Sequence, residues 1–531
     1  MGSVTELYRS QIGGASVINY SYTDFPWKLL GRDIYYFFVY AWALPWIVWP
    51  MFTYGSGELD ELYPTWRNIF CVLVHTVLVV LQLAFVVALP LCVVLPVWTA
   101  GLGIGAFMVV NCLLCKLLNG SVVTFHSDEK YAKASPEHEH EQWVFVNGVA
   151  VGEHWFKSNL NRLALTFKRP VLGIHNRTSG IIFDIIECLI QRNFSYATSD
   201  VRITYRILKE VLYDPAKSKV VLILHSQGGI EGGLVLDWLL QEIPQDLLSK
   251  LEIYTFGCAA NHFNNPHRHA FSQRLMRENP SVAAHTLVSE KTTSATTPGS
   301  SCSSPADVRN SLTIKIPPPP PPPPPSLPHE ASSSSISSTR TSSAAQDRAI
   351  GHIEHYAHST DFVAIWGVLH FATNRTGSPQ IPRFLGRLFV RSTGGGGHQL
   401  NQHYLDGMFP LLRDLVTGEL VGADEEGNEF MREVVKLGVE GDAMENIREA
   451  FDLTYAGDEG FGSGDISTPV EVHGVSGAAG ADRKMAARIK ARKQVRMKDL
   501  CRLWGYRNGK SPPETPPLLL TEGGVVRNAT M

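Results

Sequence analysis

The fold is decided by the stretch VVLILHSQGGIEGG at positions 220–233. Its first five residues are continuously apolar and favour β-structure, which is typical of a strand buried on both faces. Ser226 and a set of glycines follow at once, and the apolar periodicity of residues 234–240 then predicts a helix. The stretch therefore predicts a buried strand, a sharp turn and a helix, with the Ser226 hydroxyl exposed at the turn.

This turn resembles the nucleophile elbow of the α/β-hydrolase superfamily, whose usual pattern is G-x-S-x-G. The chain reads L-H-S-Q-G, with Leu224 in place of the first glycine. Leu224 must find room for its side chain against the following helix, and the four glycines between positions 228 and 233 allow a close approach of strand and helix. The resemblance implies a nucleophilic serine at Ser226, although a buried strand can also end in Ser-Gln-Gly-Gly by chance.

The remaining members of a catalytic triad are sought downstream of the serine. A serine hydroxyl needs a base and the base needs an orienting acid, and in this superfamily they follow in the order serine, acid, histidine. Asp361 falls in the loop after the strand-like run that begins at residue 350, and His398 ends a four-glycine loop after the predicted strand 387–391. We therefore expect Asp361 to be the acid and His398 the base. His403, one helical turn later, stays open as an alternative base, and Asp361 could also be a simple helix N-cap.

An oxyanion hole requires two N–H donors aimed at the developing negative charge. The amide of Gln227, directly after the nucleophile, supplies one donor by its position. The predicted strand 142–146 ends in Asn147-Gly148, and we expect the amide of Val149 to supply the second. The alternative for Asn-Gly is an ordinary turn.

Around these motifs, strand and helix patterns alternate as an α/β architecture requires. We expect an α/β-hydrolase domain over residues 140–417, with a mostly parallel sheet and helices on both faces. Residues 286–347 are rich in Ser and Pro and should form a disordered insertion within this domain. Its proline run, Pro317–Pro325, could recruit an SH3- or WW-type partner or serve only as a spacer.

The run 142–416 is also similar to an uncharacterised, membrane-anchored, lipase-like branch of fungal α/β-hydrolases. The similarity lies in FVNGV (145–149), IHNRT (174–178), LHSQG (224–228), AANHF (259–263) and GHQLNQHYL (397–405). It implies a serine carboxylic-ester hydrolase of the lipase or esterase type, acting in lipid metabolism on a lipophilic ester without a cofactor.

A membrane region, residues 34–118, follows a polar N-terminal segment, residues 1–33. Residues 34–57 and 68–115 contain no Asp, Glu, Lys or Arg, and about 20 apolar residues suffice for one membrane span. We expect three embedded segments, 34–54, 69–89 and 97–116. The first contains three tryptophans and two prolines, so it could be interfacial or re-entrant, and two spans remain the alternative.

The orientation follows from the distribution of charge. Lys28 and Arg32 precede the first segment and acidic residues follow it, which favours a cytosolic N-terminus. Two spans then place the hydrolase domain in the cytosol and three place it on the opposite side. The eight cysteines show no paired framework, which favours the cytosol. We expect an integral protein of an endomembrane with a cytosolic catalytic domain.

The C-terminal tail, residues 418–531, contains a basic segment at 483–504 with interspersed apolar residues. This pattern is typical of an amphipathic helix on an anionic membrane surface, or of a solvated helix. Nucleic-acid binding is not expected, because the net charge is −3 and the basic run is isolated. The histidines at 138–140 and 352–358 match no zinc-ligand spacing, so we expect no metal ion.

Three functional hypotheses remain from the sequence. The first is hydrolysis of a lipophilic ester, the second is acyl transfer by the same triad to an acceptor other than water, and the third is a catalytically silent scaffold. Leu224 is the one feature that favours the scaffold.

Overall fold

The computed structural model describes residues 4–8, 20, 23–51, 53–266, 348–373, 384, 386–393, 396–437 and 496–512. The predicted insertion 286–347, with Pro317–Pro325, lies outside the described residues. The same holds for residues 483–495 of the predicted basic segment.

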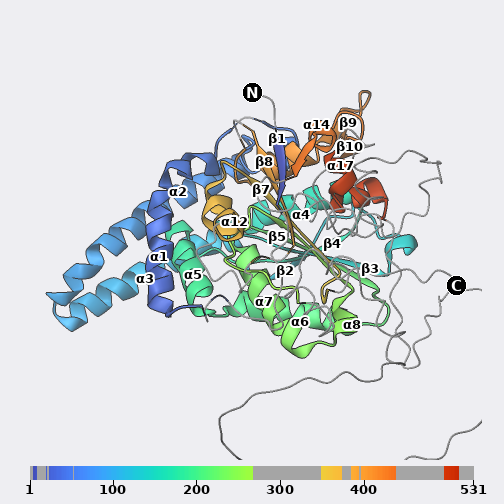
Figure 1. Cartoon of the computed structure of the whole chain (residues 1–531). Coiled ribbons are helices and arrows are strands. Elements are labelled where there is room, and N and C mark those ends of the chain that lie inside the picture. The colour runs from blue at the N-terminus through green and yellow to red at the C-terminus, as the bar shows by residue number, and fades with distance from the viewer. Residues whose placement is uncertain are drawn as a thin grey trace, which may run out of the picture.

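The fold is an α/β fold built on a nine-stranded sheet (Figure 1). Its strands are β1 (Val4–Tyr8), β2 (Thr124–His126), β3 (Glu141–Val146), β4 (Val171–Ile174), β5 (Lys219–His225), β6 (Leu251–Phe256), β7 (His352–His358), β8 (Arg387–Ser392) and β11 (Val435–Leu437). Strands β9 (Leu411–Arg413) and β10 (Leu420–Ala423) form a separate hairpin.

The strand order in the sheet is β11-β1-β8-β7-β6-β5-β3-β4-β2. The six central strands, from β8 to β4, run parallel to their neighbours, whereas β1 and β2 are antiparallel to β8 and β4. Strand β5, which leads to Ser226, lies near the middle of the sheet, between β3 and β6. The carboxyl ends of β3, β5, β6, β7 and β8 therefore meet at one edge.

The helical segments before the sheet core are α1 (Pro26–Val39), η2 (Ala41–Ile47), η3 (Gly57–Leu59), α2 (Trp66–Ala88), η4 (Leu89–Val93), α3 (Val97–Asn119) and η5 (Pro136–His138). Those that alternate with the strands are α4 (Glu153–Phe167), α5 (Ile181–Phe194), α6 (Ser199–Tyr213), α7 (Gly228–Glu242), α8 (Gln245–Leu248), α11 (Phe362–Ala364), η8 (Ile365–Leu369), α12 (His370–Thr373), η9 (Leu400–Leu405), α13 (Asp406–Met408) and α14 (Glu429–Arg432). Near the C-terminus are α17 (Met497–Leu500) and η10 (Leu503–Gly509).

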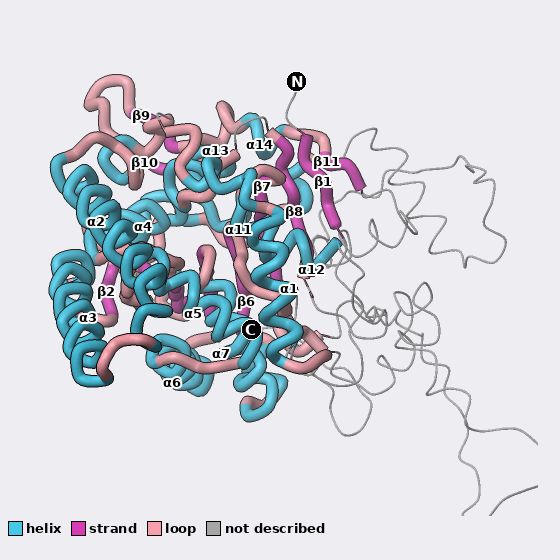
Figure 2. The backbone as a smooth tube through the Cα atoms, turned by 90° about the vertical axis from the view of Figure 1, so that its left-hand side faces the viewer, coloured by secondary structure: helices cyan, strands magenta, loops and turns pink. Residues whose placement is uncertain are grey.

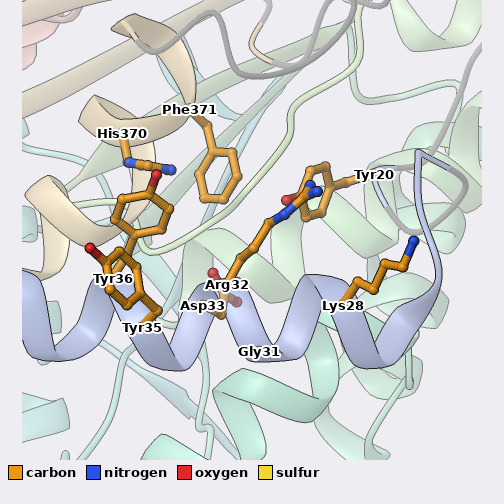
Figure 3. Close-up of a pocket in the computed structure, with 9 residues that line it drawn as sticks. All are labelled: Tyr20, Lys28, Gly31, Arg32, Asp33, Tyr35, Tyr36, His370 and Phe371. Atoms are coloured by element: carbon orange, nitrogen blue, oxygen red, sulfur yellow. The ribbon is translucent and has the colours of Figure 1, made fainter.

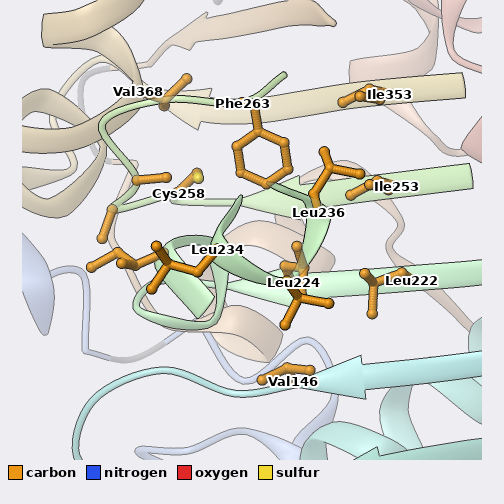
Figure 4. Packing of buried hydrophobic residues seen from close by; sticks show 14 of the residues in the cluster. Val146, Leu222, Leu224, Leu234, Leu236, Ile253, Cys258, Phe263, Ile353 and Val368 are labelled. Carbon is orange, nitrogen blue, oxygen red and sulfur yellow. The ribbon is translucent and has the colours of Figure 1, made fainter. Parts of the chain in front are cut away.

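The sheet is covered on both faces, which explains why β5 is apolar without alternation. Val220, Leu222 and Leu224 pack with α5, α6 and α7 on one face, whereas Val221 and Ile223 pack with α4 and the C-terminal segments on the other. A strand buried on both sides has no polar position to offer to water. Figure 4 shows the first of these clusters around Leu224.

Two helical stretches in the described part of the chain are long and apolar enough to cross a membrane, Trp66–Val93 and Val97–Asn119. They form a hairpin, α2-η4-α3, that projects from one side of the molecule (Figure 1). Figure 2 looks onto the molecule from that side, where α5 lies beside the hairpin and α1 lies beside α5. The two stretches agree with the predicted segments 69–89 and 97–116.

The first predicted membrane segment, 34–54, is not a spanning helix. It is divided between α1 and the short helix η2, which contains Pro45, and the inner face of these elements packs onto the α/β domain. Phe37 contacts Phe362 and Trp366, and Asp33, just before the segment, binds the buried Arg192 side chain at 3.1 Å. The structure therefore agrees with two long apolar helices and not with three.

The α/β domain also extends beyond the predicted limits of 140–417. Strands β1 and β11 add to its sheet, although they lie in the predicted polar segment 1–33 and in the predicted tail. Met497, Leu500 and Trp504, expected on a membrane-binding helix, are buried in the core instead. Arg502 joins them to the sheet through an ion pair with Glu252 at 2.8 Å.

Candidate active site

Ser226 lies at the turn between β5 and α7 in a left-handed backbone conformation, with φ of 57°. This conformation is unfavourable for a residue with a side chain and is retained where the surroundings enforce it. The Ser226 amide donates to the Phe256 carbonyl at 3.0 Å. A Cβ on Gly228, the first residue of α7, would lie 2.6 Å from the Val146 carbonyl oxygen, so glycine is required for the turn to lie this close to β3.

Leu224 finds its space over a glycine of the following helix. A Cβ on Gly232 would lie 2.2 Å from the Leu224 Cδ1 atom, and Leu224 is fully buried among the residues shown in Figure 4. The side chain that replaces the first glycine of the G-x-S-x-G pattern is thus accommodated by a glycine six residues after the serine. The departure from the pattern leaves the strand-turn-helix geometry intact.

A double-mutant cycle tests this compensation. Gly232→Ala should destabilise the fold by about 1–3 kcal/mol through overpacking, and Leu224→Ala by about 2–5 kcal/mol through a cavity. Because the added methyl group fills part of that cavity, the double variant should be more stable than the sum of the single effects predicts, by at least about 1 kcal/mol. Denaturant unfolding in a mild detergent measures the three differences. Strict additivity would show that the two side chains do not compete for the same space.

His398 reaches the serine from the loop after β8. Its Nε2 atom lies 3.0 Å from Ser226 Oγ, and its Nδ1 atom lies 2.9 Å from Asp361 Oδ2. The three predicted residues therefore form one hydrogen-bonded chain at the carboxyl edge of the sheet. All three are buried, with Ser226 3% and His398 7% exposed, so the chain is shielded from bulk water.

Asp361 follows β7 and makes both contacts that the sequence predicted: it caps a helix and it bonds His398. Its Oδ1 atom caps α11 by accepting from the Val363 amide at 2.8 Å, which leaves Oδ2 for His398. Tyr404 also donates its hydroxyl to Oδ2, at 2.7 Å. Burial alone would raise the pKa of the Asp361 carboxyl, but His398 and the Tyr404 hydroxyl lower it below its usual value. Asp361 is thus ionised and can orient an imidazole.

Gly257, at the end of β6, provides the space in which this pair meets. Its φ is 54°, and a Cβ there would lie 2.7 Å from Asp361 Oδ2 and 3.0 Å from the His398 ring. A side chain at this position would therefore collide with the hydrogen-bonded pair.

The alternative base, His403, is placed away from the serine. Its Nδ1 atom accepts from the Gln399 amide at 2.9 Å, and its Nε2 atom donates to the Pro50 carbonyl at 2.8 Å. Burial lowers the pKa of His403 to about 4, so the ring is neutral at physiological pH. His403 joins the loop of His398 to the N-terminal segment, and His398 is the histidine at Ser226.

The predicted oxyanion loop passes directly beside the serine. A Cβ on Gly148 would lie 2.8 Å from Ser226 Oγ. The peptide bond that joins Gly148 to Val149 therefore lies next to the Ser226 hydroxyl. Asn147 exchanges hydrogen bonds of 2.9 Å with the backbone of Asn176 and thereby fixes the loop. The amides of Val149 and Gln227 donate to no acceptor in the described part of the chain. Two backbone N–H donors, one in the loop after β3 and one at the N-cap of α7, therefore remain available beside Ser226.

Two supporting residues were not assigned roles by the sequence. Tyr404 bonds Asp361, and His225 donates from Nε2 to the His398 carbonyl at 2.9 Å while its ring stacks on the His398 ring. Both lie in motifs that the sequence singled out: His225 comes directly before Ser226, and Tyr404 comes six residues after His398. Their contacts are long-range, so no local pattern could have assigned their partners.

The N-terminal segment lies over the loop that carries His398. Gln399 and Gln402 donate their side-chain amides to the carbonyls of Ile47 at 3.1 Å and Pro50 at 2.7 Å. The stretch that resembled a membrane span therefore covers the loop that carries His398.

A separate cavity of about 590 Å³ lies between α1 and α12 (Figure 3). It is lined by Tyr20, Lys28, Gly31, Arg32, Asp33, Tyr35, Tyr36, His370 and Phe371, and contains no member of the Ser-His-Asp chain. His370 bonds the Tyr40 hydroxyl at 2.9 Å and takes no part in the site.

Glu231, in the first turn of α7, is fully buried. Burial raises the pKa of its carboxyl well above the usual value, and the carboxylates of Asp200 and Glu187 raise it further. The folded protein therefore holds a proton that the unfolded chain releases above about pH 4.3. This proton stabilises the fold at low pH, and the stabilisation is lost as the pH rises toward the raised pKa.

The pH dependence of Glu231→Gln tests this assignment. The amide cannot ionise, so as the pH rises above about 4.3 the native protein should lose stability relative to the variant, with a slope of at most about 1.4 kcal/mol per pH unit. Unfolding midpoints of both proteins, measured between pH 4.5 and 7.5 in one detergent, give the difference. A difference that does not change with pH would contradict a protonated Glu231.

No family model, curated protein or solved structure matches this chain.

Proposed function

We propose that this protein is a serine hydrolase of the α/β-hydrolase type that cleaves a lipophilic carboxylic ester at a membrane. The observation that carries the proposal is the continuous chain from Ser226 Oγ through His398 to Asp361, with distances of 3.0 and 2.9 Å. One ring nitrogen of His398 is bonded to a serine at a strand-helix turn and the other to a buried carboxylate, which is the arrangement by which a catalytic triad is recognised.

The strand order supports the proposed fold type. The nucleophile follows a central parallel strand, the acid and the histidine follow later strands, and all three meet at one edge of the sheet. This is the chain order serine, acid, histidine of α/β-hydrolases. The positive φ of Ser226 also agrees with a strained elbow that projects the hydroxyl.

The mechanism follows from the geometry. His398 Nε2 accepts the Ser226 proton as Oγ attacks the ester carbonyl, and Asp361 stabilises the imidazolium that forms. The amides of Val149 and Gln227 are placed to hold the oxyanion. His398 then protonates the leaving alcohol, and water, activated in turn by His398, releases the acyl group from Ser226. Transfer of the acyl group to another acceptor uses the same groups, and product analysis with a competing alcohol distinguishes the two.

The membrane assignment rests on the α2-η4-α3 hairpin. Since α1 packs on the α/β domain and precedes the hairpin, both sides of the hairpin connect to the same body. The N-terminal segment and the α/β domain then share one side of the membrane, and the position of Lys28 and Arg32 favours the cytosol. A lipophilic ester dissolved in the bilayer is the substrate class that suits this placement.

Fluorophosphonate labelling tests the proposal. A fluorophosphonate probe applied to membranes that contain the native protein should label it covalently, and the label should be absent from Ser226→Ala. Ser249→Ala, which removes an exposed serine of the same domain, is the matched control and should be labelled like the native protein. Equal labelling of the native protein and Ser226→Ala would remove Ser226 as the nucleophile.

A further inference from the structure

We infer that the α2-η4-α3 hairpin is re-entrant, so that it enters and leaves the same leaflet and its tip stays in the hydrocarbon. The inference rests on the membrane anchoring proposed above and adds how the anchor is seated. Three independent features of the hairpin lead to it: the composition of its tip, the hydrogen bonds of its backbone, and its contacts with the α/β domain.

The tip contains no residue that favours water. The connection between the two helices is Leu89-Pro90-Leu91-Cys92-Val93-Val94-Leu95-Pro96. Its valines are among the most exposed apolar side chains of the protein, with Val93 88% and Val94 78% exposed. A loop that emerges into water on the far side of a bilayer would expose these side chains at a cost of about 1 kcal/mol or more each. The tip composition is that of a segment surrounded by lipid.

The backbone of the tip is also suited to a surrounding without water. The Leu89 amide continues the bonding of α2, the amides of Val94 and Leu95 donate to the Leu91 carbonyl, and those of Thr99 and Ala100 donate to the Pro96 carbonyl. Pro90 and Pro96 have no N–H to satisfy. The Thr99 hydroxyl donates to the Pro96 carbonyl as well, at 2.6 Å. Lipid tolerates a turn when its donors are bonded internally in this way.

The α/β domain holds the inner half of the hairpin. Gln82 donates to Asn111 at 2.8 Å and to the Ser179 carbonyl at 2.7 Å, and it accepts from the Ile182 amide. Asn119 exchanges hydrogen bonds with the backbone of Thr178. These buried amides lie in the middle and at the end of apolar helices, where a free membrane span would leave them unpaired in lipid. Here they bind the loop before α5.

The part of the hairpin that extends beyond these contacts with the α/β domain is too short to cross a bilayer. One turn above Gln82 and Asn111, Phe85 stacks on Phe107, and both rings contact Phe183 of α5. From Phe107 back to Val97 there are eleven residues, or about 16 Å of helix at 1.5 Å each. The hydrocarbon core is about 30 Å thick, so the free part reaches roughly the depth of one leaflet.

The surface around the base suits the headgroup region. Helix α5, next to the hairpin in Figure 2, and helix α1 beside it expose apolar and aromatic side chains, namely Trp27, Tyr35, Phe38, Ile186, Ile190 and Phe194. Lys28 and Arg32 lie on the same α1 helix. Aromatic and basic side chains of this kind are typical of helices that lie in the membrane interface.

A charge at the tip distinguishes a re-entrant hairpin from two spans. In a re-entrant hairpin, Val94→Lys places an ammonium group in the hydrocarbon and should lower the ratio of membrane-bound to free protein by about 100-fold. With two spans, Val94 would face water and the substitution would leave that ratio unchanged. Val122→Lys, the same change at an exposed position just beyond the base of α3, is the matched control and should bind like the native protein. Sedimentation of full-length protein with phosphatidylcholine vesicles measures the ratio.

The native Cys92 gives a second readout that does not depend on a mutation at the tip. In sealed vesicles a membrane-impermeant maleimide should fail to label Cys92 from either side, with Cys92→Ser as the blank and detergent-opened vesicles as the positive control. Labelling from the side opposite the catalytic domain would overturn the re-entrant hairpin and leave the hydrolase proposal intact. A native protein that does not bind vesicles would overturn the anchor itself, whereas loss of Ser226 labelling would overturn only the hydrolase.

Discussion

Replacing Ser226 with alanine should lower kcat for ester hydrolysis by about 10⁴- to 10⁶-fold, because no other group can form the acyl-enzyme. Alanine keeps the Cβ atom and removes only the hydroxyl, so the packing of this position against Gly148 is preserved. The thermal midpoint should therefore stay within a few degrees of the native value. Hydrolysis of p-nitrophenyl esters of several chain lengths by detergent-solubilised protein measures the loss.

Ser249→Ala is the control for this comparison, since it removes an exposed serine from the same domain. It should retain native kcat. If Ser226→Ala keeps a tenth or more of the native rate while folded, the hydroxyl is not the nucleophile and the proposed mechanism fails.

His398→Ala should lower kcat by a comparable factor, about 10⁴-fold or more, because the serine then lacks its base. His403→Ala, in the η9 segment that directly follows this loop, is the matched comparison. It removes the bonds to Pro50 and to the Gln399 amide, which lie away from the serine, so it should lower the thermal stability while costing less than about 10-fold in kcat. Parallel measurements of kcat and unfolding midpoint for both variants separate the chemical role from the structural one.

The opposite ranking would reverse the assignment. A His403→Ala variant that loses activity while His398→Ala retains it would mean that the loop rearranges to present His403. Equal and small losses for both would indicate that no histidine acts on Ser226.

The members of the site could be predicted because each has a strong local signal. The apolar strand 220–224, the serine and the glycines specify a strand-turn-helix unit, and the structure has β5 and α7 at these positions. Asp361 and His398 each follow a strand, and parallel strands bring their carboxyl ends to one edge, so sequence order was enough to indicate a meeting point.

The outer parts of the fold could not be predicted for physical reasons. The segment 34–54 is apolar and aromatic because its inner face packs on the α/β domain and on the loop of His398, while its outer face is exposed. This composition does not differ from that of a membrane span. Strands β1 and β11 are five and three residues long and pair with each other at one edge of the sheet. Short edge strands are determined by long-range pairing more than by local preference. The burial of Met497 and Trp504 depends in the same way on distant partners.

Leu224 illustrates how a local departure is resolved at a distance. The sequence indicated that a leucine at this position needs space, but not which residue provides it. The structure assigns that space to Gly232 in the following helix. A silent scaffold has no need to preserve this geometry together with the Ser226, His398 and Asp361 chain.

The central claim is that Ser226 Oγ is a nucleophile activated by His398. Its most direct measurement is to treat the native protein in membranes with a fluorophosphonate, digest it and locate the phosphonyl group by tandem mass spectrometry. The proposed mechanism predicts a single adduct on Ser226 that is lost in His398→Ala. An adduct on another residue, or an unmodified Ser226 in protein that is folded, would contradict it.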